Sequence, residues 1–128
     1  HGLDPVGYDA GLAAVARNHS ADMVARGYYA HESPDGDVAF DRVQSRSVAC
    51  SSVGENIAAT WWQRPFETLE GERDRHTTVE QLAEGLVEQW LNSSEHRANM
   101  LRADWERTGV GVAVTDKGEV LVTQTFCE

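Results

Sequence analysis

Apolar side chains recur at helical spacing in two long segments of the chain. Over residues 9–26 they form one face with a period near 3.6, which predicts an amphipathic helix capped by Asp9 and ended by Gly27. A second, unbroken apolar stripe runs through residues 79–91, and a Thr-x-x-Glu capping box at residues 77–80 precedes it. These two segments are therefore expected to be the main helices.

Shorter elements follow from weaker patterns. Residues 39–44 and 94–101 are expected to form short helices, and the mostly apolar residues 56–62 a strand. Two valine-rich segments, 108–115 and 119–126, alternate around an Asp-Lys-Gly turn and predict a hairpin.

The remaining segments are expected to be loops. Residues 45–54 show no period, and the polar stretch 63–76 holds Pro, Gly and seven charged residues, which is typical of a functional or mobile loop. The order helix, loop, strand, helix, hairpin indicates one α+β domain over residues 1–128, with a small, mostly antiparallel sheet covered by helices.

The charge balance narrows the possible partners. Twenty-one acidic residues against eleven basic ones give a net charge of −10, which repels nucleic acid and anionic bilayers over most of the surface. Lys117 is the single lysine. An acidic, lysine-poor surface suits a protein that works in concentrated salt, where self-repulsion is screened, although compositional drift in a GC-rich genome is an alternative.

No apolar run approaches the 18 or so residues of a membrane span, and no leader-like segment opens the sequence. Any export signal is therefore expected to lie outside the residues shown.

The two cysteines, Cys50 and Cys127, have no partner at zinc-finger spacing, so a closed structural zinc site is not expected. A disulfide between them would be strongly stabilising in an oxidising compartment, because it would close a long loop. Two unpaired thiols are the alternative.

Three residues could carry chemistry together. His31 lies in a Pro/Gly turn, His96 opens a short helix, and Glu55 stands immediately before the strand predicted at residues 56–62. A carboxylate can orient an imidazole, and two His with one carboxylate form the ligand set of an open zinc site. Because 24 and 41 residues separate the three, spacing alone also allows three unrelated polar residues.

Two other polar residues have simpler interpretations. His19 lies on the apolar face of the first helix, which favours a hydrogen-bonded core histidine. Ser93 and His96 are three residues apart and could form a nucleophile with its base, but no Gly-x-Ser-x-Gly elbow surrounds Ser93, and an N-cap serine is the simpler hypothesis.

Taken together, several motifs resemble the SCP-like prokaryotic branch of the CAP superfamily. They occur in that family's order and cover nearly the whole chain, as His31-Glu32-Ser33-Pro34-Asp35-Gly36, Phe40-Asp41-Arg42, Gly54-Glu55-Asn56-Ile57-Ala58, Trp90-Leu91-Asn92-Ser93-Ser94-Glu95-His96-Arg97-Ala98-Asn99-Met100-Leu101, Gly109-Val110-Gly111-Val112 and Thr123-Gln124-Thr125-Phe126-Cys127. The acidic, lysine-poor surface and the cysteine pair are similar to those of secreted members from halophilic archaea.

The resemblance implies an α–β–α sandwich with an open cleft, where the family places two His and two Glu. His31, Glu55 and His96 match three of these positions, and Ser93 stands where the second Glu would be. The chain lacks most of the family's opening helix, so the domain is expected to begin before residue 1. An exported family also favours a Cys50–Cys127 disulfide.

The function implied is that of a secreted or cell-surface protein whose cleft binds a divalent metal, zinc or magnesium, or a small ligand, lipid or cell-surface component. His31, Glu55 and His96 are the expected ligands, with Ser93 or water completing a metal site. One alternative is a hydrolase acting on esters or peptides. Another is an interaction module that uses Trp61, Trp62 and Phe66 as anchors.

Overall fold

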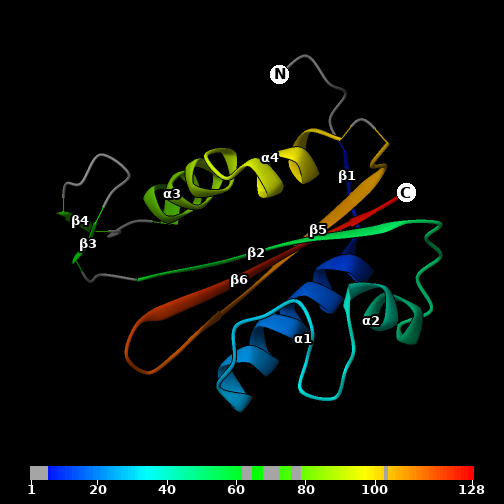
Figure 1. Cartoon of the computed structure of the whole chain (residues 1–128), viewed down its shortest axis with the longest axis horizontal. Coiled ribbons are helices and arrows are strands. Elements are labelled where there is room, and N and C mark those ends of the chain that lie inside the picture. Colours follow the sequence, from blue (N-terminus) through cyan, green and yellow to red (C-terminus); the bar gives the residue numbers. More distant parts are fainter. Residues whose placement is uncertain (1–5, 62–64, 68–72, 76–78, 103) are drawn as a thin grey trace.

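Helices cover both faces of a central sheet. The computed structural model describes residues 6–61, 65–67, 73–75, 79–102 and 104–128. One face of the sheet carries helices α3 (Val79–Leu91) and α4 (Ser94–Leu101), and the other carries α1 (Ala10–Arg26) and α2 (Ala39–Ser45) (Figure 1). This arrangement confirms the predicted α+β class and the α–β–α sandwich.

Four strands form the central sheet in the order β1-β5-β6-β2. The strands are β1 (Gly7–Tyr8), β2 (Val53–Trp61), β5 (Arg107–Val114) and β6 (Glu119–Cys127). β6 pairs antiparallel with both β2 and β5, which confirms the hairpin, whereas β1 pairs parallel with β5. The sequence pattern does not predict β1, because two residues are too few to show an alternation.

The first helix has the ends that its sequence predicts. The Asp9 side chain accepts a hydrogen bond of 3.0 Å from the Leu12 amide, and Gly27 ends the helix with a φ of 68°. Its buried apolar face includes Leu12, Val15 and Met23 and packs on β5 and β6. The short helices α2 and α4 likewise lie where they were expected.

Two glycines of β5 let α1 approach the sheet closely. A Cβ atom on Gly109 would overlap the backbone nitrogen of Ala13, and one on Gly111 would overlap that of Arg17. Glycine is therefore required at both positions by contact between backbones.

Strand β2 begins three residues earlier than expected. Its ladder with β6 runs from Val53, opposite Cys127, to Trp61, so Glu55 lies within the strand and not before it. Residues 45–54 were expected to be a loop, but pairing with β6 extends the strand into that non-periodic segment. Trp62, the predicted end of the strand, lies outside the described residues.

The polar stretch 63–76 also differs from the expected loop. It contains the short strands β3 (Pro65–Glu67) and β4 (Arg73–Arg75), which pair with each other in a separate antiparallel sheet. Segments of three residues are too short for sequence periodicity to identify. Residues 77 and 78, which include the start of the expected capping box, are outside the described part of the chain.

The apolar core lies on both sides of the sheet. Between the sheet and α3 it consists of Ala58, Leu86, Trp90, Val120 and Val122. Beneath the other face, Leu12 and Val15 of α1 pack with Val43 of α2 and with Cys127. Among the residues that the structure describes, no helix has the length and apolar character needed to cross a bilayer.

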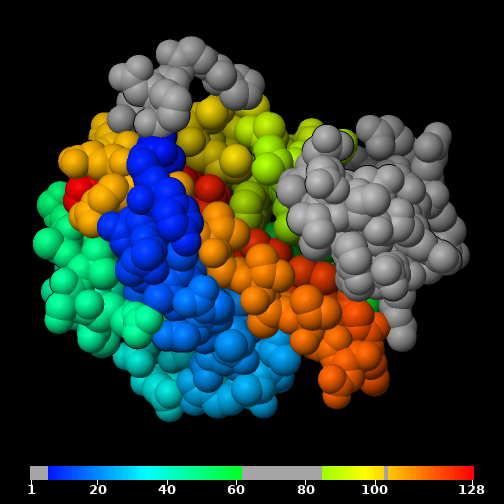
Figure 2. Space-filling model, turned by 180° about the vertical axis from the view of Figure 1, so that it is seen from behind, coloured from blue at the N-terminus to red at the C-terminus, as the bar shows by residue number. Residues whose placement is uncertain are grey.

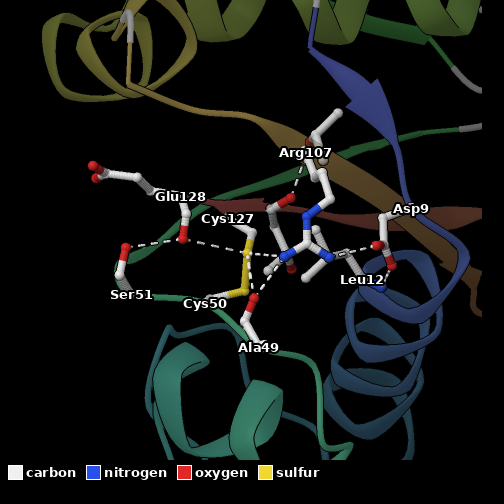
Figure 3. Close-up of a disulfide and its surroundings, with 10 residues drawn as sticks. Asp9, Leu12, Ala49, Cys50, Ser51, Arg107, Cys127 and Glu128 are labelled. Atoms are coloured by element: carbon white, nitrogen blue, oxygen red, sulfur yellow. Dashed lines mark hydrogen bonds and ion pairs between the residues drawn. A yellow bond between two sulfur atoms is a disulfide. The ribbon is translucent and has the colours of Figure 1, made fainter.

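A disulfide joins Cys50 to Cys127 and ties the segment after α2 to the end of β6 (Figure 3). Arg107 lies beside it and donates hydrogen bonds to the Ala49 carbonyl at 2.6 Å and to Asp9 Oδ2 at 2.8 Å. These contacts join the start of α1, the segment after α2 and β5 at one point. The structure thus confirms the pairing that the resemblance favoured.

Reduction of this disulfide should destabilise the domain. The bond closes a loop spanning 77 residues, so its loss should lower the free energy of unfolding by about 4–5 kcal/mol in the chain-entropy model. Urea denaturation with and without dithiothreitol measures the effect. A Cys50→Ala/Cys127→Ala variant is the control, because its midpoint should be low and should not respond to the reductant. An equal response of both proteins would contradict the prediction.

Candidate functional site

The buried carboxylate of Glu55 is the centre of the candidate site. Only 4% of its side chain is exposed, and both of its oxygens are occupied. Oε1 lies 2.8 Å from His31 Nδ1, and Oε2 accepts a hydrogen bond of 2.6 Å from Arg42 Nη2. A buried carboxylate is costly unless it is paired, so these contacts hold Glu55 in one position.

Arg42 is a member of the site that sequence analysis did not single out. From α2 it reaches Glu55, and it also donates hydrogen bonds to the backbone carbonyls of His31 at 3.1 Å and Asp37 at 3.0 Å. Arg42 therefore fixes the turn that carries His31 as well as the carboxylate. Its only signal in the sequence was its place in the Phe40-Asp41-Arg42 motif.

The contact with Glu55 sets the proton position on His31. A carboxylate can only accept, so Nδ1 carries the hydrogen and the lone pair of the neutral ring is on Nε2. Slightly more than half of the His31 side chain, 55%, is exposed. The hydrogen bond raises the pKa of His31 above its usual value near 6.5, and partial burial acts in the opposite direction. His31 thus offers a basic nitrogen to solvent.

His96 comes from the other helical layer and is positioned through its backbone. Asn56, next to Glu55 on β2, donates a hydrogen bond of 3.2 Å to the His96 carbonyl. Asn99, one turn further along α4, donates one of 3.1 Å to the Glu55 carbonyl. Both asparagines lie in motifs that carry the family resemblance, but these motifs do not predict that the two side chains join β2 to α4.

The charge of His31 affects the pKa of His96. Burial lowers the pKa of His96, the charge of His31 lowers it further, and Glu95 acts in the opposite direction. The same Glu95 contributes to raising the pKa of His31. As the pH falls, His31 therefore protonates before His96.

His19 has the structural role expected of it. It is buried on α1, its Nε2 lies 2.9 Å from the Ala30 carbonyl, and burial lowers its pKa. The same nitrogen is 3.9 Å from Glu55 Oε1. A buried imidazole, whose burial disfavours its charged form, thus lies next to the Glu55 carboxylate.

Ser93 occupies the N-cap position of α4, but its side chain makes no capping hydrogen bond. No hydrogen bond in the described structure joins its hydroxyl to His96, as a nucleophile and its base would require. Within the described residues, no three His, Cys, Asp or Glu side chains are arranged so as to hold one metal ion together. Of the three expected ligands, His31 and Glu55 are in direct contact. His96 is held next to β2 through the hydrogen bond from Asn56 to its carbonyl.

The aromatic residues of the interaction-module hypothesis are mostly not described. Trp61 is half-buried at the end of β2, Trp62 lies outside the described residues, and nothing is established about the Phe66 side chain.

The model of the cysteine-rich secretory protein family, CAP, matches residues 1–126. The chain therefore belongs to this family. An uncharacterized membrane protein of Bacillus subtilis (strain 168) is 33% identical over 112 residues, which cover 88% of this chain and 27% of that protein. The chain thus spans about a quarter of this relative's length.

Two solved structures share the fold. An extracellular protein containing an SCP domain from Bacillus anthracis str. Ames has a TM-score of 0.73 and 32% identity, over 100% of this chain and 35% of that one. An outer surface protein from Borrelia burgdorferi has a TM-score of 0.75 and 17% identity, over 98% of this chain and 79% of that one. These structural relatives are extracellular or surface proteins.

The two site histidines should titrate at different pH values. His31 should have a pKa above 6.5 and His96 one below it, because Glu55 stabilises the charged form of His31 while burial and His31 oppose charge on His96. Glu55→Gln should lower the pKa of His31, because Arg42 remains beside it without its counter-charge.

NMR titration of the imidazole nitrogens measures both values. Glu106→Gln, an exposed carboxylate outside the site, is the matched control and should leave them unchanged. Equal pKa values for His31 in the wild type and in Glu55→Gln would contradict the assigned role of Glu55.

Proposed function

We propose that this CAP domain acts outside the cell or at its surface and binds a divalent metal or a small ligand between His31 and His96. The hydrogen bond from His31 Nδ1 to Glu55 is the observation that carries this proposal. It orients the partly exposed His31 ring, and the effect of the His31 charge on the pKa of His96 indicates that the two imidazoles lie within electrostatic reach of each other. The extracellular relatives and the disulfide support the location.

In this proposal Glu55 orients the site and does not bind the metal directly. Its oxygens are held by His31 and Arg42, which is the arrangement of a carboxylate that supports a metal-binding histidine from behind. Two imidazoles are fewer protein ligands than the three of a typical catalytic zinc site, so affinity should be modest. A bound Zn²⁺ would supply Lewis acidity, with water or Ser93 as further ligands.

Calorimetric titration with Zn²⁺ tests the metal assignment. His31→Ala and His96→Ala should each abolish binding at millimolar metal, and Glu55→Gln should weaken it about 10–100-fold through loss of orientation. Leu86→Ala is the control, since Leu86 belongs to the core on the α3 face. It should keep binding while losing about 2–5 kcal/mol of stability. Equal binding by all these proteins, or none by the wild type, would refute the metal site.

A hydrolase is the second candidate, and the same hydrogen bond favours it. A carboxylate that fixes the tautomer of a histidine leaves the other nitrogen able to take a proton from water attacking an ester or peptide carbonyl. His31 would be the base, and Glu55 would stabilise its charged form. This chemistry requires turnover, which a binding module lacks.

Turnover of model esters and peptides separates the two functions. As a binding module, the wild-type protein should hydrolyse them no faster than the His31→Ala variant. A wild-type rate that falls in both His31→Ala and Glu55→Gln would instead establish the hydrolase.

A further inference from the structure

A cavity of about 350 Å³ lies between α1, α2 and the turn at residues 33–37. Figure 2 shows the face of the molecule where α1 runs between the α2 segment and the β5–β6 hairpin. Arg42 and His19 belong to the cavity wall, but the other lining residues are different from those of the site described above. Its volume lies at the lower end of the range of about 300–1,000 Å³ for small-molecule pockets, so a small ligand fits it.

Most charges around this cavity are neutralised within the protein. Arg26 pairs with Asp22 and with Asp35, each at 2.8 Å. Arg42 pairs with the buried Glu55 at 2.6 Å. These side chains have their counter-charges and do not need one from a ligand.

Two oppositely charged residues of the lining have no counter-charge paired with them within the described residues. The side chains of Arg46, at the end of α2, and Asp37, in the turn, make no ion pair or hydrogen bond within the described residues, and they do not pair with each other. The cavity therefore presents one available guanidinium and one available carboxylate. A ligand that carries both a negative and a positive group would complement the two.

Several other residues of the lining have polar side chains. Ser33 Oγ accepts a hydrogen bond from the Asp37 amide at 3.1 Å, which leaves the Ser33 hydroxyl hydrogen free to donate. Asn18 adds an amide, and the Ser45 hydroxyl, which donates to the Asp41 carbonyl at 2.9 Å, adds an acceptor; Val15 contributes an apolar side chain. These polar groups can hydrogen-bond a small polar molecule.

We infer that this cavity binds the zwitterion of a free α-amino acid with a small polar side chain. Arg46 receives the carboxylate, for which a guanidinium has the matching two-donor geometry, and Asp37 receives the ammonium group. Asn18 and the two serines hydrogen-bond the remaining polar groups. This site uses neither His31 nor His96, so it does not depend on the function proposed above.

Calorimetric titration with L-serine tests the inference. The wild-type protein should bind it saturably in the millimolar range or more tightly, and Arg46→Gln and Asp37→Asn should each weaken binding about tenfold or more. N-acetyl-L-serine, which lacks the positive charge, and L-serinamide, which lacks the negative one, should show the same loss. Triglycine, whose charged ends lie farther apart than those of a free amino acid, tests a peptide source.

Arg97→Gln is the matched control, since Arg97 is an exposed arginine of α4 on the opposite helical layer. Arg46 and Asp37 are also exposed, so thermal melts should show that all three variants are folded. The inference is overturned if L-serine does not bind, if neither Arg46→Gln nor Asp37→Asn weakens binding, or if either blocked analogue or triglycine binds as well as L-serine.

Discussion

The position of Glu55 depends on the cost of burying its charge. A carboxylate removed from water needs opposite charge and hydrogen-bond donors. Arg42 and His31 supply these from α2 and from the turn before it, across a sequence distance of 13 and 24 residues. The turn and α2 are thereby held against β2, and the exposed nitrogen of His31 has a defined direction. Within the described residues, no other hydrogen bond holds that imidazole.

Strand β2, which carries Glu55, also has backbone groups at the edge of the sheet that need hydrogen-bond partners. β2 is the last strand of the sheet, so carbonyl groups on its free side have no neighbouring strand. Trp90 Nε1 donates to the Ile57 carbonyl at 3.1 Å, and Asn99 donates to that of Glu55. The helices α3 and α4 therefore cover this edge through side-chain hydrogen bonds. This attachment holds α4, and with it the backbone of His96, next to the part of β2 that carries Glu55.

Arg42 links the two regions to which we assign binding. Its guanidinium group neutralises Glu55 on one side, and it forms part of the wall of the α1–α2 cavity on the other. Because the group is already paired, the cavity offers a ligand the charges of Arg46 and Asp37 instead. The histidine site and the cavity thus present different chemistry, imidazole nitrogens in one case and a separated pair of charges in the other.

The sequence by itself determined the elements whose pattern is local and long. The apolar period of α1, with Asp9 and Gly27 at its ends, and the alternating valines of the hairpin were sufficient. The family resemblance favoured the cysteine pair, which the structure confirms. The binding role of His31, Glu55 and His96 stays a prediction. Salt adaptation of the acidic surface stays a prediction. Only the tertiary structure decided the short strands, the start of β2, the contacts of Arg42 and Asn99, and the cavity. These depend on which distant segments pack together, and residues that meet only after packing leave no periodic signal in the chain.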